Sequence, residues 1–421
     1  MGDLTVSVII VSRGRPDALR RCLAGVAQLQ YRSFEVVVVA CPEGITVTEH
    51  SSVLPDIKCI AFDEANISRA RNIGLEHAAG EVVAFIDDDA VPEPQWLRHL
   101  VAPAARSDVA AMGGFVRGRN GISYQYKART LDAQGTPHAV EIDPLQATVL
   151  VPPAGRAIKT EGTNMAFRRD VLVEIGGFDP AFRFFLDETD VNMRLARAGH
   201  ATALVPLAQV HHGFAASAMR RADRVPRDLY EIGASWAVFQ RKHIPKHDRA
   251  AHWSALRASE RQRALRHMVS GGLEPRDVRR LMKRLLAGYA EGQTRSLMTK
   301  PLARHAVLPF RAVDVPRRKV GFSAVRGLRG TAAIEAAAAR VAQGSIETVL
   351  VLSRTAMFHR VAFEASGVWV QRGGIFGRSD RDGPLVRLTS FGRRVRAEQE
   401  RITPFRGSGV VESGSGLLKD M

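Results

Sequence analysis

The sequence has few cysteines and no long apolar run. Cys22, Cys41 and Cys59 are the only cysteines among the 421 residues, and their odd number in apolar or strand-like surroundings predicts reduced thiols rather than a disulfide framework. No apolar stretch approaches the ~20 residues that a membrane-spanning helix needs. The first residues also lack the basic region and cleavage site of a signal peptide. We therefore expect a protein of the cytoplasm.

Two phosphate-binding signatures are also missing. The sequence contains neither a GxxxxGK[ST] loop nor a GxGxxG loop, which weakens the case for a kinase, an ATPase or a dehydrogenase. Aromatic residues are sparse in the basic second half, so binding of nucleic acid through base stacking is not expected.

Charge is distributed unevenly along the chain. Residues 1–210 carry a net charge of −4, whereas residues 211–421 carry +21, which together give the +17 of the whole chain. A basic half attracts polyanions, and an anionic membrane surface at the inner face is one candidate partner. The alternative is a solvated basic surface with no particular partner.

The first ninety residues alternate between strand and helix patterns. Short β-branched runs at 6–11, 35–40, 57–62 and 81–86 predict buried parallel strands. Helical patterns at 16–26 and 67–79 separate them. Repeated strand–helix units predict an α/β fold, a mostly parallel sheet with helices on both faces. Ligands of such sheets bind beyond the carboxyl ends of the strands.

Three adjacent acids stand at that position. Asp87, Asp88 and Asp89 directly follow the predicted strand 81–86. Adjacent carboxylates repel one another unless a cation or solvent offsets their charge, and hard oxygen ligands suit Mg²⁺ or Mn²⁺. The sequence therefore predicts a divalent-metal site here, with a solvated acidic turn as the alternative.

A second acidic cluster opens the helix predicted at 188–198. Asp187 and Glu188 follow an apolar Phe-Phe-Leu run, so a partly desolvated carboxylate at this place can serve as a general base. Acids at a helix start also complement the helix dipole, which is the structural alternative.

Two basic features complete the candidate site. His211 and His212 end the strand predicted at 201–212, and because neighbouring strand residues face opposite sides, at most one of them enters a given site. Imidazole is a suitable third ligand for Mn²⁺. Arg69 and Arg71, on the helix before the acidic strand, can bind phosphate or orient the acidic turn.

Taken together, these segments resemble the family 2 glycosyltransferases with the GT-A fold. The resemblance covers about residues 5–215 and rests on five segments in the expected order. They are a first strand and nucleotide loop (VSVIIVSR, 6–13), an Ala-Arg-Asn helix (ISRARNIG, 67–74), a DxD-type motif (FIDDD, 85–89), an acceptor-side segment (EGTNMAFR, 161–168, with GGFD, 176–179) and a catalytic helix (FLDETDVNMR, 185–194).

The resemblance implies an inverting transfer from a nucleotide-diphosphate sugar to the hydroxyl of a glycan or lipid-linked acceptor. It implies Mn²⁺ or Mg²⁺ as cofactor and Glu188, with Asp187, as the catalytic carboxylate. The residues implied for the metal are Asp89, Asp87 and His211, with His212 as the alternative to His211. Those implied for the nucleotide sugar are Ser12, Arg13, Glu43, Arg71, Asp87, Asp88 and Asn164.

Two departures from the family pattern bear on these roles. The catalytic pair is usually Glu-Asp, and here it is Asp187-Glu188, so either acid could be the base. The second strand usually ends in an Asp that holds the nucleotide base, whereas Cys41, Pro42 and Glu43 follow it here. Glu43 is the expected substitute.

The expected domain order follows from these patterns. A GT-A domain at 1–215 precedes a basic helical extension at 216–300, a connector at 301–330, a small C-terminal α/β or α+β domain at 331–406 and a disordered tail at 407–421. Two other functions remain as alternatives: a sugar nucleotidyltransferase, and a non-catalytic polyanion-binding protein on a degenerate transferase scaffold.

Overall fold

A ten-stranded sheet organises the first half of the chain. The computed structural model describes residues 3–54, 56–297, 301–314 and 318–407, and the backbone of 410–412. The sheet runs in the order β10-β13-β6-β12-β4-β1-β2-β3, with β5 added beside β13 and β7 beside β6. Its strands are β1 (Val6–Ser12), β2 (Phe34–Ala40), β3 (Lys58–Ala61), β4 (Val82–Asp87), β5 (Ala90–Pro92), β6 (Val109–Arg117), β7 (Tyr124–Tyr126), β10 (Thr148–Leu150), β12 (Asn164–Arg168) and β13 (Ala201–His212).

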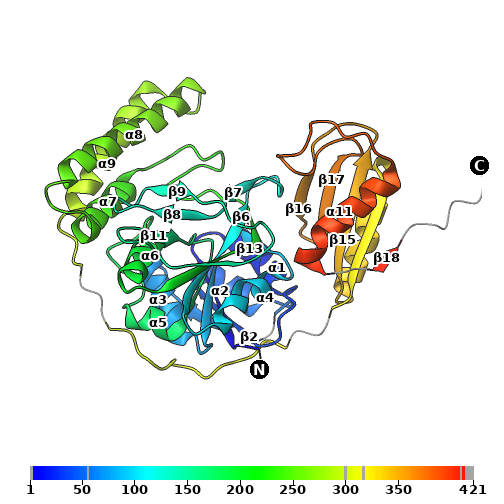
Figure 1. The fold of residues 1–421 in the computed structure, drawn as a ribbon, viewed down its shortest axis with the longest axis horizontal. Coiled ribbons are helices and arrows are strands. Elements are labelled where there is room, and N and C mark those ends of the chain that lie inside the picture. The colour runs from blue at the N-terminus through cyan, green and yellow to red at the C-terminus, as the bar shows by residue number, and fades with distance from the viewer. Residues whose placement is uncertain (1–2, 55, 298–300, 315–317, 408–409, 413–421) are drawn as a thin grey trace, which may run out of the picture.

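The four strands expected at the start of the chain form the parallel part of this sheet. β1 lies between β2 and β4 and is parallel to both, and β3 adds to β2. β12 enters antiparallel between β4 and β6, while β13 is parallel to β6. β-Branched side chains fill both faces, which are covered by helices (Figure 1). The expected α/β fold with a mostly parallel sheet is confirmed.

Helices and small strands surround the sheet. The helices are α1 (Pro16–Val26), α2 (Pro42–Glu49), α3 (Ile67–His77), α4 (Trp96–Val101) with the 3₁₀ turn η1 (Ala102–Ala105), α5 (Arg169–Glu174) and α6 (Asp187–Arg197). The segment between β7 and β12, which lacks a clear pattern in the sequence, forms a second small sheet of β11 (Ala157–Lys159), β8 (Arg129–Leu131) and β9 (Pro137–Ala139).

Three helices form the basic extension. They are α7 (Tyr230–His243), α8 (Arg249–Val269) and α9 (Pro275–Gly292). α7 packs closely on α9, since a Cβ atom on Gly288 would meet the Tyr230 carbonyl oxygen at 1.8 Å. α8 and α9 form a hairpin that projects away from the sheet (Figure 1). None of the described helices is long and apolar enough to cross a membrane.

The connector lies along the domain that is built on the ten-stranded sheet. Its backbone amides at Val307 and Val313 donate to the carbonyls of Glu76 and Phe34, at 2.9 and 2.8 Å. The side chain of Val313 is buried in the main core. The expected connector at 301–330 is wrong at its C-terminal end, because a regular strand already begins at Val320.

The C-terminal domain is a five-stranded sheet with one long helix on each face. Its strand order is β16-β17-β15-β14-β18, and α10 and α11 each cover an apolar cluster on it. The elements are β14 (Val320–Arg326), the 3₁₀ turn η2 (Gly327–Arg329), α10 (Gly330–Ala342), β15 (Ile346–Ser353), β16 (Arg360–Phe363), β17 (Trp369–Gly374), α11 (Phe391–Arg406) and β18 (Val410–Glu412). The domain thus begins earlier than the expected residue 331.

The expectation for the C-terminal tail also needs correction. Before α11, Val386 forms an isolated bridge to Gly377. The tail expected to be disordered contains β18, which pairs with β14 over three residues. The expected disorder of 408–409 and 413–421 lies outside the described residues.

Buried contacts join the C-terminal domain to the domain that is built on the ten-stranded sheet. Arg406, at the end of α11, forms a bidentate ion pair with Glu93, which follows β5, with nitrogen–oxygen distances of 2.8 and 2.9 Å. The Arg406 guanidinium also lies 4.2 Å from the ring centre of Trp369. Both charged side chains are almost completely buried. If the ion pair were broken, water could not solvate the remaining charge, and the folded state would lose stability.

Replacing Arg406 by Met is therefore expected to lower the free energy of unfolding by about 3–5 kcal/mol, because Glu93 would be left buried without its cation. Burial alone would raise the pKa of Glu93, but Arg406 and His211 hold it below its usual range. The ion pair thus contributes stability above the unfolded-state pKa of about 4, and this contribution is lost as pH falls. Urea unfolding followed by tryptophan fluorescence at pH 7 would measure the loss. The exposed Arg393→Met is the matched control, and equal midpoints for both variants would contradict the prediction.

Candidate active site

The acidic triplet lies where β4 leaves the sheet. β4 is buried on both faces, and its last residue, Asp87, pairs in register with Val11 of β1. Asp88 and Asp89 follow in the turn to β5. The turn directs the three carboxylates to different partners, so the adjacent acids have separate roles.

Asp87 and Asp89 come together with His212. One ligand atom from each of these residues lies within 4.8 Å of the other two. The Nε2 atom of His212 lies 3.2 Å from Asp89 Oδ1, and β5 holds this geometry because His212 pairs with Ala90 in the antiparallel β5–β13 ladder. Two carboxylates and one imidazole can hold a divalent metal, and this donor set suits Mn²⁺.

Asp89 is kept ionised for such a role. Burial alone would raise its pKa, but His212 and Arg15 lower it well below the usual range. The backbone amide of Ala215 also donates to Asp89 Oδ2 at 2.8 Å. An ionised carboxylate is the form that binds a metal, so the surroundings of Asp89 favour ligation.

His211 faces the other side of β13, and the expectation that it is the metal ligand is not supported. Its Nε2 lies 2.8 Å from Glu93 Oε1, and its ring lies 5.0 Å from that of Trp369. Burial lowers the pKa of His211, which favours the neutral imidazole. The alternation of side chains along a strand thus assigns His212 to the acidic site and His211 to the interface with the C-terminal domain.

Asp88 is fully buried and points away from the metal group. It accepts a hydrogen bond from Ser12 Oγ at 2.7 Å and forms an ion pair with Arg15 at 2.5 Å. Burial raises its pKa to about 7, although the charge of Arg15 opposes this shift. Asp88 and Ser12 therefore join the end of β4 to the end of β1, and neither is free to contact a sugar nucleotide directly.

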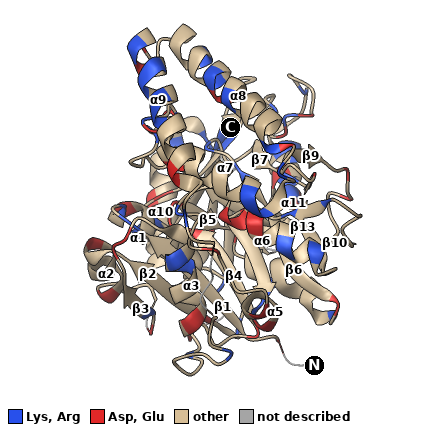
Figure 2. Cartoon of the chain, turned by 90° about the vertical axis from the view of Figure 1, so that its left-hand side faces the viewer, with Lys and Arg blue, Asp and Glu red and all other residues tan. Residues whose placement is uncertain are grey.

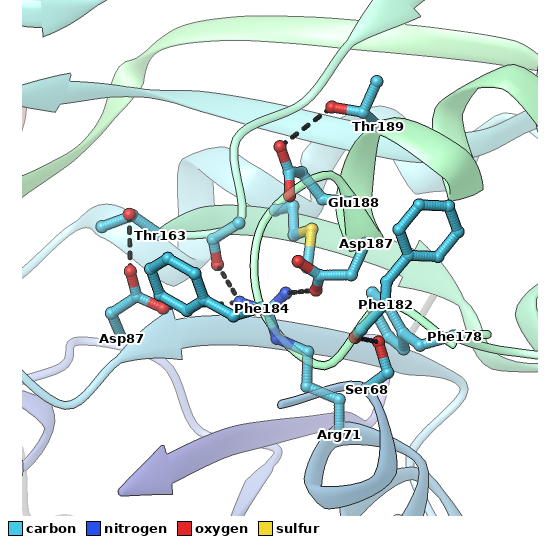
Figure 3. A network of polar contacts seen from close by, with 12 residues as sticks. Ser68, Arg71, Asp87, Thr163, Phe178, Phe182, Phe184, Asp187, Glu188 and Thr189 are labelled. Atoms are coloured by element: carbon cyan, nitrogen blue, oxygen red, sulfur yellow. Dashed lines mark hydrogen bonds and ion pairs between the residues drawn. The ribbon is translucent and has the colours of Figure 1, made fainter. Parts of the chain in front are cut away.

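Arg71 links the two acidic clusters. From α3 it forms an ion pair with Asp187 at the start of α6, reaches Asp87 Oδ1 at 3.4 Å, and donates to the Gly162 carbonyl at 3.0 Å (Figure 3). Burial alone would lower the pKa of Arg71, but the charges of Asp187 and Asp87 raise it. One guanidinium thus fixes the metal-side aspartate relative to the helix that carries Glu188.

The two acids of α6 have different surroundings. Asp187 is buried against Arg71, whereas the Glu188 side chain keeps 17% of its surface exposed and forms an ion pair with Lys159 of β11 at 2.5 Å. Burial raises the pKa of Asp187, while Lys159 more than offsets burial and lowers that of Glu188. Glu188 is therefore both the more accessible acid and the one that is ionised over the wider pH range.

A backbone irregularity precedes these acids. Phe185 and Leu186 both have positive φ angles, 71° and 66°, which is uncommon outside glycine. Leu186 is buried, and Phe185 packs edge-on against Trp236 of α7 with ring centres 5.9 Å apart. Backbone strain held by packing is often found at functional sites, and here it sets the direction in which α6 begins.

Three other predicted residues do not belong to the central group. Asn164 lies in the core, where its amide nitrogen donates to two backbone carbonyls and its oxygen accepts from Trp96; the expected role in sugar-nucleotide binding is therefore wrong. Arg13 is half-exposed and pairs with Asp63 at 3.0 Å. Glu43 is exposed at the start of α2, and the Cys41 thiol lowers its pKa. Arg13 and Glu43 stand at the rim, beyond the ends of β1 and β2.

Three residues that contact the acids are not among those predicted from the sequence. Arg15 follows the first strand and pairs with Asp88 and Asp89. Thr163 Oγ1 donates to Asp87 Oδ2 at 2.7 Å, and Lys159 holds Glu188. Thr163 lies within the acceptor-side segment, and Arg15 lies only two residues beyond the nucleotide loop. Their closeness to these segments could have identified both as site residues. Nothing local marks Lys159, which reaches Glu188 only through the small β11–β8–β9 sheet.

Replacing Lys159 by Met is expected to move the acidic limb of the pH–activity profile to higher pH. The positive charge lowers the pKa of Glu188, so its removal lets that pKa rise, and the ionised form is lost at a higher pH than in the wild type. The measurement is kcat/KM as a function of pH, with whichever donor and acceptor the protein is found to use. Lys127→Met, an exposed lysine one strand away, is the control. An unmoved limb in Lys159→Met would contradict the coupling.

Comparison with known families and proteins agrees with this geometry. Residues 3–230 match the model of the "Glycosyltransferase like family 2". The chain is 28% identical over 268 residues to the O-antigen biosynthesis protein RfbC of Myxococcus xanthus, which is 59% of this chain and 20% of that protein. It is 29% identical over 191 residues to the glucosyl-dolichyl phosphate glucuronosyltransferase of Haloferax volcanii, 42% of this chain and 56% of the relative. The alignments thus span less than two thirds of these relatives.

Two solved structures are similar to part of this chain. TarS of S. aureus (residues 1–349, with UDP-GlcNAc) is 15% identical, with a TM-score of 0.42 over 63% of this chain and 73% of that one. The mannosyltransferase PcManGT of Pyrobaculum calidifontis, with GDP-Man and Mn²⁺, is 16% identical, with a TM-score of 0.38 over 70% of this chain and 88% of that one.

Proposed function

The chain belongs to the glycosyltransferase like family 2, a family of nucleotide-sugar-dependent transferases, and on that premise we propose that it is an inverting, metal-dependent enzyme. It moves a sugar from a nucleotide-diphosphate sugar to an acceptor hydroxyl. The observation that carries this proposal is the bridge of Arg71 between Asp87 and Asp187, because it joins a metal-type site to a carboxylate helix in one rigid unit.

The donor side is the group of Asp87, Asp89 and His212. A bound Mn²⁺ or Mg²⁺ would offset the charge that develops on the leaving nucleoside diphosphate. Arg13 and Glu43 stand at the rim beyond β1 and β2, where a nucleoside extends from a parallel sheet. Arg15 and Ser12 hold Asp88 inward, so that the outer two acids keep their spacing.

The acceptor side is Glu188. Its ionised carboxylate accepts the proton of the acceptor hydroxyl as that oxygen attacks the anomeric carbon from the face opposite the diphosphate. The C–O bond to the diphosphate breaks as the new glycosidic bond forms, which inverts the anomeric centre. Asp187 does not compete for this role, because Arg71 occupies it.

The acceptor is a glycan or a lipid-linked glycan at the inner face of a membrane. Two relatives are named for O-antigen and succinoglycan biosynthesis; the second, ExoM of Rhizobium meliloti, is 35% identical over 81 residues, 19% of this chain and 26% of that protein. The family match favours a transferase over a sugar nucleotidyltransferase.

A donor panel tests the proposal. UDP-, GDP- and dTDP-sugars are incubated with the protein and Mn²⁺ or Mg²⁺, and the released nucleoside diphosphate is measured. We expect release from one donor type, its loss with a chelator, and its return with excess metal. Release that persists undiminished in the chelator would refute the metal-dependent mechanism.

A further inference from the structure

The hairpin of α8 and α9 uses only one of its faces for packing. Leu281 and Leu285 of α9 and Ala264 of α8 are buried in a cluster with Leu229 and Val278. This inner face attaches the hairpin to the body of the protein. The two helices project from the body of the protein, and both carry several Lys and Arg residues (Figure 2).

An open groove of about 1000 Å³ lies between α8 and α9, next to this cluster. Apolar side chains, among them Leu265, Met268, Met282 and Leu286, line it together with four bases, Arg257, Arg261, Arg279 and Lys283. Leu286 is 44% exposed, and Val269 at the tip of the hairpin is 84% exposed. The open face is thus apolar in its lining and tip, and basic along its sides.

The bases of the groove differ in their partners from most of the other bases of the hairpin. Arg263, Arg276, Arg280 and Arg284 each form an ion pair with a carboxylate. In the part of the chain that the structure describes, no carboxylate pairs with the four groove bases. Residues 249–292 contain ten Lys and Arg but four Asp and Glu, a net charge of +6. Four of the bases without a carboxylate partner therefore lie together along the groove, beside the apolar side chains that line it.

We propose that the α8–α9 hairpin docks this protein onto an anionic phospholipid surface. The four unpaired bases contact lipid phosphates, while Val269 and the apolar lining enter the boundary between headgroups and acyl chains. Long basic side chains suit this position, because their stems cover apolar surface while their charges stay in water. None of the groove-lining residues is aromatic, which disfavours single-stranded nucleic acid, whose bases stack on aromatic rings.

The hairpin is coupled to the catalytic helix through α7. Lys242 Nζ and His243 Nε2 at the end of α7 lie 2.8 and 2.7 Å from Asp190 Oδ1 in α6. Docking through the hairpin therefore places Glu188 at a fixed height above the lipid surface. This placement would give Glu188 access to a lipid-linked acceptor, an inference that rests on the proposed function. Docking itself needs neither donor nor metal.

Vesicle flotation with the full chain tests this proposal. We expect the protein to float with phosphatidylcholine vesicles that contain phosphatidylglycerol, to stay behind with phosphatidylcholine alone, and to be released by high salt. Changing Arg257, Arg261, Arg279 and Lys283 together to Glu is expected to weaken vesicle binding more than about 100-fold, since each basic residue contributes about fivefold. The matched control carries Glu at Arg98, Arg329, Arg393 and Arg396, exposed bases outside the hairpin with the same change in net charge.

Three results separate the possible explanations. Val269→Ser, which changes no charge, is expected to weaken binding to anionic vesicles several-fold if the tip inserts. Equal flotation with neutral and anionic vesicles, or equal losses in the two charge-reversed variants, would overturn the proposal. Binding of duplex DNA or RNA that depends on the four bases, without vesicle binding, would also overturn it. Glu188→Gln is expected to float like the wild type, so a failure of the catalytic proposal leaves this test intact.

Discussion

Replacing Glu188 by Gln is expected to reduce kcat by about 10²–10⁴-fold, the usual contribution of a positioned general base. The amide keeps the size of the side chain and can still accept a hydrogen bond from Lys159, but it cannot take a proton from the acceptor. The proposed site for the metal and the nucleoside diphosphate lies on the other side of Arg71, so their affinities should not change.

The neighbouring Asp187→Asn variant distinguishes a base from a positioning residue. Asp187 holds Arg71, and its loss should weaken donor binding as well as turnover, because Arg71 also holds Asp87. Activity is measured as transfer to acceptor, and binding by calorimetry with Mn²⁺ and the diphosphate of the active donor. A Glu188→Gln enzyme with near wild-type kcat would rule out Glu188 as the base.

The two adjacent histidines give the second large effect. His212→Ala is expected to weaken Mn²⁺-dependent binding of the nucleoside diphosphate by at least about 10-fold, since even the loss of outer contacts to a metal ligand costs 10–100-fold. His211→Ala removes an identical side chain one residue away. It should leave metal-dependent binding close to wild type, because His211 contacts Glu93 and Trp369 and not the aspartates.

This pair of variants separates ligation from general damage to β13. His211→Ala should lower the unfolding midpoint through the loss of its contact with Glu93, whereas His212→Ala should mainly affect binding. Calorimetric titration of UDP or GDP with and without Mn²⁺, together with thermal unfolding of each variant, provides both readouts. Loss of Mn²⁺-dependent binding in His211→Ala but not in His212→Ala would contradict the assignment.

Much of the sheet could be predicted from the sequence, because buried parallel strands need long β-branched runs. Such runs are VSVIIV, EVVVVA and EVVAFI, and they favour strands over helices. The last of them ends directly before the acidic triplet. The helix α11 is not evident from the sequence, because seven of its sixteen residues are charged. Its few buried apolar side chains, such as Ile402 and Phe405, do not produce an obvious stripe.

The candidate site could be predicted only in part, because side-chain direction depends on neighbours that are distant in sequence. Alternation along β13 indicated that one histidine enters the site, but its pairing with β5 decides that this is His212. Asn164 faces the core because β12 is inserted between β4 and β6, an arrangement that no local pattern reveals. Lys159 likewise reaches Glu188 only once the small sheet has formed.

Anomalous diffraction from crystals grown with Mn²⁺ and the nucleoside diphosphate of the active donor tests most directly whether Asp87, Asp89 and His212 form the metal site that we propose for a nucleotide-sugar transferase. We predict one strong peak in contact with Asp89 and His212, with His211 still bonded to Glu93. Saturating Mn²⁺ and nucleotide with no peak at these residues, or a peak bound by His211, would contradict the account.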